Sequence, residues 1–222
     1  MYLPPNNTIT DEAVIHDFVR QHDFATLITA DADGVPFASH IPLTLLQKPD
    51  GTCILHGHLA RANMHWKLLE QGRSTLAIFH GPHTYVSPRW YNHENVPTWN
   101  YQVVHAYCKP RINTDLKALQ ENVTHLTELY EHETGYSVGG LSPKLLGAEL
   151  RGIVGIELAV ERFEAKFKLS QNRDAESHAN IIHELRSNGS ENGAAIAAAM
   201  EAHTPHTTSL QTTLLQKDIP KI

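Results

Sequence analysis

The chain has 222 residues, and 41% of them are hydrophobic, which is enough apolar material for one large domain or two small ones. No run approaches the about 18 to 20 consecutive apolar residues of a membrane-spanning helix, and the first residues lack a signal-peptide pattern, so we expect a cytoplasmic protein with no membrane partner. The 18 Lys and Arg against 24 Asp and Glu give a net charge of −6, which excludes attraction of nucleic acid by the field of the whole molecule.

The N-terminal half predicts one short helix followed by a series of strands. Asp11 and Glu12 precede apolar residues at helical spacing, and carboxylates in a first turn are favourable against the helix dipole. Asp33-Gly34 is a tight-turn signal between two β-rich runs, so those runs form a hairpin. Strand-like runs occur at 24–30, 35–42, 52–57, 74–80 and 98–112. A helix is expected over 64–71, and a Pro- and aromatic-rich loop over 81–97.

The C-terminal half alternates between helices and one more strand. From Thr114, apolar residues recur every three or four positions until Gly135, which predicts a helix with one buried stripe. The stripe consists of Leu116, Leu119, Val123, Leu126, Leu129 and Tyr130. Ser142-Pro143 begins a short helix by cap and first-turn proline, and residues 151–163 alternate as a strand. Two further helices are expected at about 176–186 and 193–203.

These elements together predict an α+β fold dominated by an antiparallel β-barrel, with peripheral helices. We expect the barrel domain over 1–172, with a helical insertion at about 114–149. C-terminal helices over 173–203 follow, and 204–222 is expected as a flexible or partner-bound tail because it has no apolar period.

The segment 56–63 (HGHLARAN) is the first candidate site. It joins a strand to a helix start, where unpaired N–H groups and the helix dipole favour a phosphate, and Arg61 adds a cation. Arg61 and Asn63 are equally expected as a surface charge and a structural cap. His56 and His58 lie on the same side of a strand, which suits either two metal ligands or the polar lining of a pocket.

The second candidate region is the run Thr98-Trp99-Asn100-Tyr101. Aromatic and amide side chains suit a flat heteroaromatic ligand, and they equally suit a subunit interface. Lys168 and Gln171 lie at a strand end, where they offer phosphate or ring contacts or simply cap a turn. The two cysteines, Cys53 and Cys108, are isolated, which favours buried small hydrophobic side chains.

No motif for a common catalytic class is present. The sequence has no GxSxG, no Walker-type glycine loop, no GxGxxG and no HExxH motif. No motif therefore supports a hydrolase, a kinase, a dinucleotide-binding fold or a zinc protease, and no metal is expected.

Several blocks, in order along about residues 1–190, resemble one family. They are Met1-Tyr2, FATL (24–27), SHIPL (39–43), GHLARAN (57–63), GPH (81–83), YVSP (85–88), VPTWNY (96–101) and FKLSQN (167–172). Together they resemble the PaiB family, described as FMN-binding negative transcriptional regulators. Met64-His65 and Arg89 depart from the pattern, where the family has Pro-Gln and Ser.

The resemblance implies a split β-barrel that works as a homodimer with FMN at the subunit interface. It carries the block 57–63, with His58, Arg61, Ala62 and Asn63, to the phosphate side, and Thr98, Trp99 and Asn100 to the ring or interface. The function implied is an FMN-binding regulator with DNA as a partner by resemblance only. The alternatives are a flavin-dependent oxidoreductase that uses NAD(P)H, and a haem-binding split barrel that uses a histidine such as His58 or His40.

Overall fold

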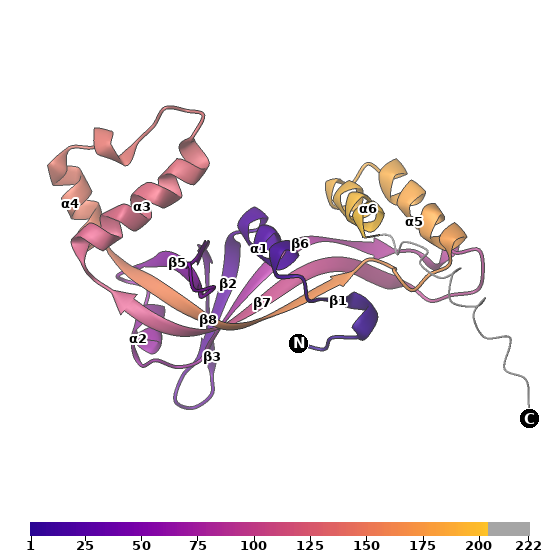
Figure 1. Ribbon diagram of the computed structural model, residues 1–222, viewed down its shortest axis with the longest axis horizontal. Helices are drawn as coiled ribbons and strands as arrows, with labels where there is room; N and C mark the ends of the chain where they lie inside the picture. The colour runs from indigo at the N-terminus through magenta and orange to yellow at the C-terminus, as the bar shows by residue number, and fades with distance from the viewer. Residues whose placement is uncertain (204–222) are drawn as a thin grey trace, which may run out of the picture. The chain divides into compact units, whose positions relative to one another are not determined.

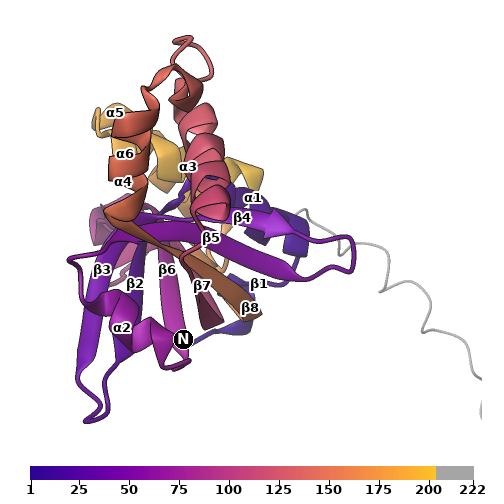
Figure 2. The same cartoon turned by 90° about the vertical axis from the view of Figure 1, so that its left-hand side faces the viewer.

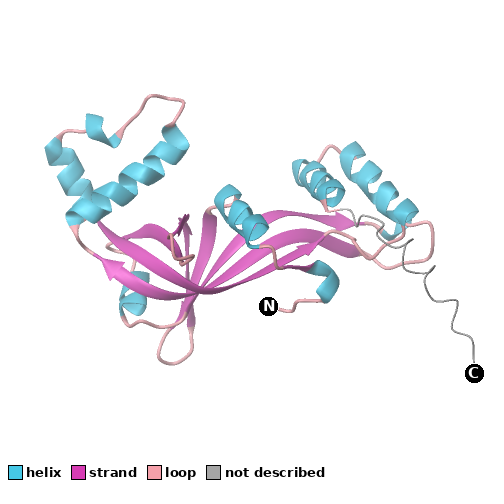
Figure 3. Ribbon diagram, viewed as in Figure 1, coloured by secondary structure: helices cyan, strands magenta, loops and turns pink. Residues whose placement is uncertain are grey.

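The computed structural model describes residues 1–203, and their strands pair in one sheet that is not closed (Figures 1 and 3). The strand order is β3-β2-β6-β7-β8-β5-β4, and β1 pairs with β8 off this path. The registered pairs β2–β3, β2–β6, β4–β5, β5–β8 and β1–β8 are all antiparallel. The strands are β1 (Thr8–Ile9), β2 (Phe24–Ala30), β3 (Pro36–Pro42), β4 (Thr44–Gln47), β5 (Cys53–Ala60), β6 (Thr75–Val86), β7 (Thr98–Asn113) and β8 (Ile153–Lys168).

Each helix predicted from the sequence is present, and α6 begins at Glu191, earlier than the predicted start at 193. Asp11, Asp115, Ser142, Asp174 and Ser190 each accept a backbone N–H through the side chain at a helix N-cap, which satisfies an otherwise unpaired donor. The α-helices are α1 (Glu12–Gln21), α2 (His65–Glu70), α3 (Leu116–Glu131), α4 (Pro143–Arg151), α5 (Ala175–Ser187) and α6 (Glu191–Ala202). No helix within residues 1–203 is long and apolar enough to cross a membrane.

The chain divides into two compact units. Unit 1 comprises residues 1–81 and 102–166, and unit 2 comprises residues 82–101 and the chain from Phe167 onward. Unit 1 holds β1 to β5 and α1 to α4, whereas unit 2 holds α5 and α6. The long strands β6, β7 and β8 contribute residues to both units. Each unit is described by itself below.

The core of unit 1 comes from alternate positions of its strands. On β5, Leu55, Gly57 and Leu59 are buried while the intervening residues are half-buried, as a strand with one core face requires. Gly57 has no side chain for a steric reason, since an added Cβ would lie 2.8 Å from Leu43 Cδ2 and 3.0 Å from the Pro42 carbonyl oxygen. The opposite face of β5 therefore carries His56 and His58.

The helical insertion between β7 and β8 differs from its predicted packing. Helices α3 and α4 lie over the β5 region (Figure 2). Of the predicted buried stripe on α3, only Leu119 is buried, whereas Leu116, Leu129 and Tyr130 are 49%, 48% and 54% exposed. The prediction of a single buried stripe was therefore wrong, because the sheet covers less of α3 than its apolar residues span.

Two strands run further than their sequence patterns indicate. Strand β5 continues to Ala60, so that His58 is a strand residue rather than part of a strand-to-helix connection. Strand β6 continues through Val86 into the segment predicted as a loop, with Pro82 inside it. Pairing with neighbouring strands overrides the local turn signal of Gly81-Pro82. The predicted tail, 204–222, lies outside the described residues.

Candidate functional site

The nine candidate residues fall into two groups, one in each unit. His58, Arg61, Ala62 and Asn63 belong to unit 1, and Thr98, Trp99, Asn100, Lys168 and Gln171 belong to unit 2. In unit 1 the structure keeps Arg61, Ala62 and Asn63 in one turn, whereas His58 lies within strand β5 and apart from that turn.

Arg61 begins the turn between β5 and α2 and is bound to the start of β8. Its backbone N–H donates to the Gly152 carbonyl at 2.8 Å. Its side chain donates from Nε to the carbonyl of Arg151 at 2.9 Å and from Nη2 to the carbonyl of Ile153 at 3.0 Å. Carbonyl groups at a helix C-terminus lack intrahelical partners, and a basic side chain satisfies them. Arg61 thus caps α4, and its Nη1 group is in neither of these two bonds.

The turn is closed by a backbone bond from Asn63 N to Ala60 O at 2.8 Å, and Asn63 is half-buried. Ala62 is exposed, and its backbone N–H takes part in none of these turn bonds. An anion that approaches here would meet two donors, the Ala62 N–H and the Arg61 Nη1 group. The turn is therefore compatible with a phosphate.

Asn63 supports α2 and is not directed toward a ligand. Its Oδ1 accepts the His65 N–H at 3.0 Å, and its Nδ2 donates to Ser39 Oγ at 3.0 Å. Ser39 Oγ also lies 2.9 Å from His65 Nδ1, and the His65 ring packs on Phe37 with centroids 5.0 Å apart. His65 is fully buried, and burial lowers its pKa. His65, which departs from the pattern of the PaiB family, is therefore a core residue.

His58 is placed away from the turn, on the face of β5 that α3 covers. Burial lowers the pKa of His58, and a hydrogen bond with Asn122 of α3 opposes that shift. Within residues 1–203, the buried Nδ1 of His58 has no hydrogen-bond partner.

Asn100 is a buried structural residue of unit 2. It is fully buried, its Nδ2 donates to Ser170 Oγ at 3.0 Å, and its Oδ1 accepts from the same hydroxyl at 3.1 Å. Asn100 Nδ2 also lies 3.5 Å from Met200 Sδ on α6. Ser170 has φ +61°, a left-handed conformation that is uncommon for a residue with a Cβ. Asn100 therefore contacts both the turn after β8 and helix α6.

Lys168 and Gln171 also bond to the backbone around them. The Lys168 ammonium donates to Thr98 Oγ1 and to the Trp99 carbonyl, the latter at 2.8 Å. Gln171 Oε1 accepts the Leu169 N–H at 2.7 Å, and its Nε2 donates to the Phe167 carbonyl. These contacts close the turn at the end of β8 and join β8 to β7.

Trp99 is the exception in unit 2, because 53% of its side chain is exposed. Its ring centroid lies 6.1 Å from that of Tyr85, edge to face, and 6.3 Å from that of His83. The three side chains come from β6 and β7. An exposed aromatic surface can stack on a planar ligand or pack against another protein surface.

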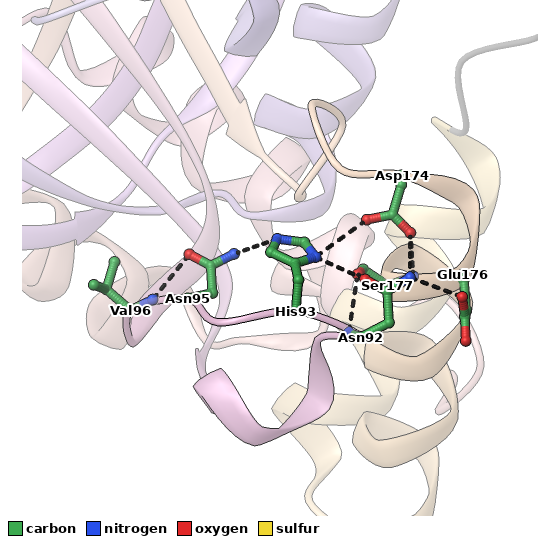
Figure 4. A network of polar contacts seen from close by, with 7 residues as sticks. All are labelled: Asn92, His93, Asn95, Val96, Asp174, Glu176 and Ser177. Atoms are coloured by element: carbon green, nitrogen blue, oxygen red, sulfur yellow. Dashed lines mark hydrogen bonds and ion pairs between the residues drawn. The ribbon is translucent and has the colours of Figure 1, made fainter.

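A polar network that the sequence analysis missed anchors the loop before β7 to the start of α5 (Figure 4). Asn92 donates to Glu176 at 2.7 Å and accepts from Ser177 Oγ at 2.9 Å. The Ser177 N–H donates to Asp174 at 2.9 Å, and this bond lowers the pKa of Asp174. The sequence analysis predicted the helix but not its cap at Asp174. The network fixes the loop and brings no ligand-binding group into a cavity.

Metal-binding groups were also sought in the part of the chain that the structure describes. No three His, Cys, Asp or Glu side chains within residues 1–203 are grouped so as to hold a metal ion. Cys53 and Cys108 are buried, and burial raises the pKa of both thiols, that of Cys108 to about 12. Both thiols are therefore poor nucleophiles near neutral pH.

Comparison with known proteins identifies relatives over most of the chain. Residues 1–162 match the family described as "Putative FMN-binding domain". "Protease synthase and sporulation protein PAI 2" of Bacillus subtilis is 40% identical over 203 residues, which cover 90% of this chain and 97% of the relative.

Solved structures share the fold at low sequence identity. The FAD and heme binding protein from Mycobacterium smegmatis has a TM-score of 0.59 at 15% identity, covering 78% of each chain. The flavocytochrome Anf3 from Azotobacter vinelandii has a TM-score of 0.54 at 14% identity, covering 80% of this chain and 78% of that one. The open antiparallel sheet is thus that of a split barrel. From the family match and the Bacillus subtilis relative together, this chain belongs to the PaiB family.

Proposed function

We propose that the chain binds FMN and uses the bound flavin as a signal in the control of transcription. The proposal that the chain binds FMN rests on the match of residues 1–162 to a family described as FMN-binding. The cofactor supplies redox chemistry when bound, and the protein positions it.

The turn at residues 61–63 is the proposed phosphate contact. Arg61 keeps one guanidinium nitrogen outside its two carbonyl bonds, and Ala62 presents a backbone N–H without a bulky side chain in front of it. Both are donors, and charge-assisted bonds to phosphate are about twice as strong as neutral ones. Asn63 supports this turn, and His58 belongs to the strand before it. The proposal requires no ligand contact from either residue.

Trp99 is the proposed stacking contact in unit 2. The exposed indole beside Tyr85 offers an aromatic face to the isoalloxazine ring. The buried Asn100 and the Lys168 and Gln171 bonds hold the strand end that carries it.

A flavin fluorescence titration tests both contacts. Arg61→Ala should weaken FMN affinity by about 1.5 to 3 kcal/mol, the range for a hydrogen bond to a charged group. Arg20→Ala is the matched control, because Arg20 is an exposed arginine on α1 that pairs with Asp17. Trp99→Leu should weaken affinity while Trp99→Phe retains it. If Arg61→Ala and Arg20→Ala bind FMN equally, the phosphate assignment fails.

The regulatory half rests on the resemblance to the PaiB family and on the Bacillus subtilis relative, whose name refers to protease synthesis and sporulation. We propose a homodimer, because large apolar side chains on α3 and α4 remain exposed, among them Leu129 and Leu145. Light scattering should give twice the chain mass of 24.8 kDa.

Promoter duplexes should shift in a gel at low salt in the presence of the protein and be released as the salt concentration rises. Absence of any shift at low salt would reject DNA as a partner.

A further inference from the structure

A cavity lies between α3 and the strands β4, β5 and β8, and none of the nine candidate flavin residues lines it. Its volume is about 430 Å³, and every residue that lines it belongs to unit 1. This volume falls within the range of sites that bind small organic molecules.

The wall of the cavity depends on a glycine. An added Cβ at Gly155 would lie 2.7 Å from Leu119 Cδ2 and 3.0 Å from the Asn113 carbonyl oxygen. The missing side chain therefore lets α3 approach β8, and it places Leu119 against the sheet. Leu46 and Ile156 complete an apolar lining. A ligand here must have an apolar part.

A positioned carboxylate provides the main polar group. Glu157 is half-buried on β8, and its Oε1 accepts from Asn113 Nδ2 at 2.9 Å. Asn113 is itself held, because its Oδ1 accepts the Asp115 N–H at 3.0 Å. The second oxygen of Glu157 takes no part in this bond. The fold thus orients the carboxylate at the cavity, and the residues that line the cavity include no Lys or Arg.

The neighbouring imidazole does not neutralise that charge. His56 is directly opposite Glu157 in the β5–β8 pairing. Burial lowers the pKa of His56, with His125 and Lys48 acting in the same direction, and only Glu157 opposes the shift. Glu121 of α3 is a second carboxylate in the lining, but it pairs with Lys117 at 3.8 Å, so Glu157 is the main charge. At neutral pH the cavity therefore presents negative charge and hydrogen-bond acceptors.

We propose that this cavity binds a small organic cation, a protonated primary amine with a short apolar body. The ammonium group pairs with Glu157, and the apolar body lies against Leu46, Leu119 and Ile156. An ammonium has three donors and no acceptor, which matches a lining of carboxylates and the neutral imidazole of His56.

Three isosteric probes test the charge preference on the full chain. Benzylammonium, benzyl alcohol and benzoate are titrated while backbone amide shifts are followed by NMR. Benzylammonium should shift amides of α3, β5 and β8 and bind at least about tenfold more tightly than benzyl alcohol, because only the cation forms a charge-assisted bond. Equal affinity for the neutral probe, tighter binding of benzoate, or no shift with benzylammonium overturns the proposal.

Matched variants then localise the binding. Glu157→Gln should weaken benzylammonium binding about tenfold or more, because it removes the charge and keeps an acceptor for Asn113. Glu149→Gln, on the exposed face of α4, should leave it unchanged. Ala118→Trp should fill the cavity and abolish binding. Wild-type affinity in both Glu157→Gln and Ala118→Trp contradicts the site. FMN is titrated into each variant separately, so that failure of the amine site is distinguishable from failure of the flavin proposal.

Discussion

The guanidinium of Arg61 donates from Nε to the carbonyl oxygen of Arg151 at 2.9 Å, across 90 positions in the sequence. The residue proposed to bind phosphate is therefore also the cap of α4. A loss of flavin affinity in an Arg61 variant has two contributions, a missing ligand contact and a loosened helix end. Measurements without flavin separate them.

Arg61→Ala should lower the free energy of unfolding by about 1 kcal/mol in the absence of FMN, because two hydrogen bonds to backbone carbonyls are lost at an exposed site. Urea unfolding of the flavin-free protein measures this effect. Amide hydrogen exchange should accelerate at the α4–β8 junction, near Gly152. An unchanged unfolding curve and unchanged exchange would show that water replaces the cap at no cost.

Asn100→Ala should destabilise the protein by about 2 kcal/mol, because it leaves the buried hydroxyl of Ser170 unsatisfied. Asn172→Ala, at an exposed position in the same segment, should lie within about 0.5 kcal/mol of the wild type. Thermal and urea unfolding provide the comparison. Equal stability of the two variants would contradict a structural role for Asn100.

Ser170 provides a comparison between backbone conformation and hydrogen bonding. Ser170→Ala loses both bonds to Asn100 and keeps a Cβ at φ +61°, whereas Ser170→Gly loses the same bonds and removes the Cβ. Since a left-handed conformation costs a residue with a Cβ about 1 to 2 kcal/mol, Ser170→Gly should be the more stable of the two by about 1 kcal/mol. The reverse order would show that the turn is not left-handed in solution.

Stability should fall as the pH decreases from 7 toward 5. Burial is the first cause of a lowered pKa at His22, His56, His58, His65, His105 and His178. A folded-state pKa below the ordinary value of 6.5 means that the unfolded chain takes up protons first. The stabilisation is therefore fully present above pH 6.5 and is lost as the pH falls through the folded-state values.

The contribution of His65 can be isolated from this total. His65→Asn should reduce the difference between the unfolding free energies at pH 7 and pH 5.5, because it removes one buried titrating ring. His132→Asn, which changes an exposed histidine at the end of α3, should keep the wild-type difference. An identical pH dependence in His65→Asn and the wild type would contradict the role of His65.

Local sequence signals predicted most of the elements, but not the short strands β1 and β4. The cap at Ser142 and the alternation on β8 are properties of neighbouring residues, and the structure confirms them. The extension of β6 through Pro82 depends on its pairing with other strands, which no local pattern contains. The exposure of Leu129 and Tyr130 likewise depends on how little of α3 the sheet covers.

The candidate site was predictable as residue types and not as contacts. The sequence pointed to Arg61 as a donor, but its bonds to Arg151 and Ile153 join segments whose proximity only the fold creates. His58 belongs to the predicted motif, but it lies on the face of β5 that α3 covers, because β5 continues to Ala60. The Asn113–Glu157 pair joins the ends of β7 and β8 across the helical insertion, so no spacing rule could find it.

The central claim is that this chain binds FMN, and its most direct test is the visible absorption spectrum of the purified protein after incubation with FMN and removal of free flavin by gel filtration. The account predicts flavin bands that co-elute with the protein at about one equivalent per chain, as expected for a cofactor that the fold positions. A colourless protein after the same treatment would contradict it.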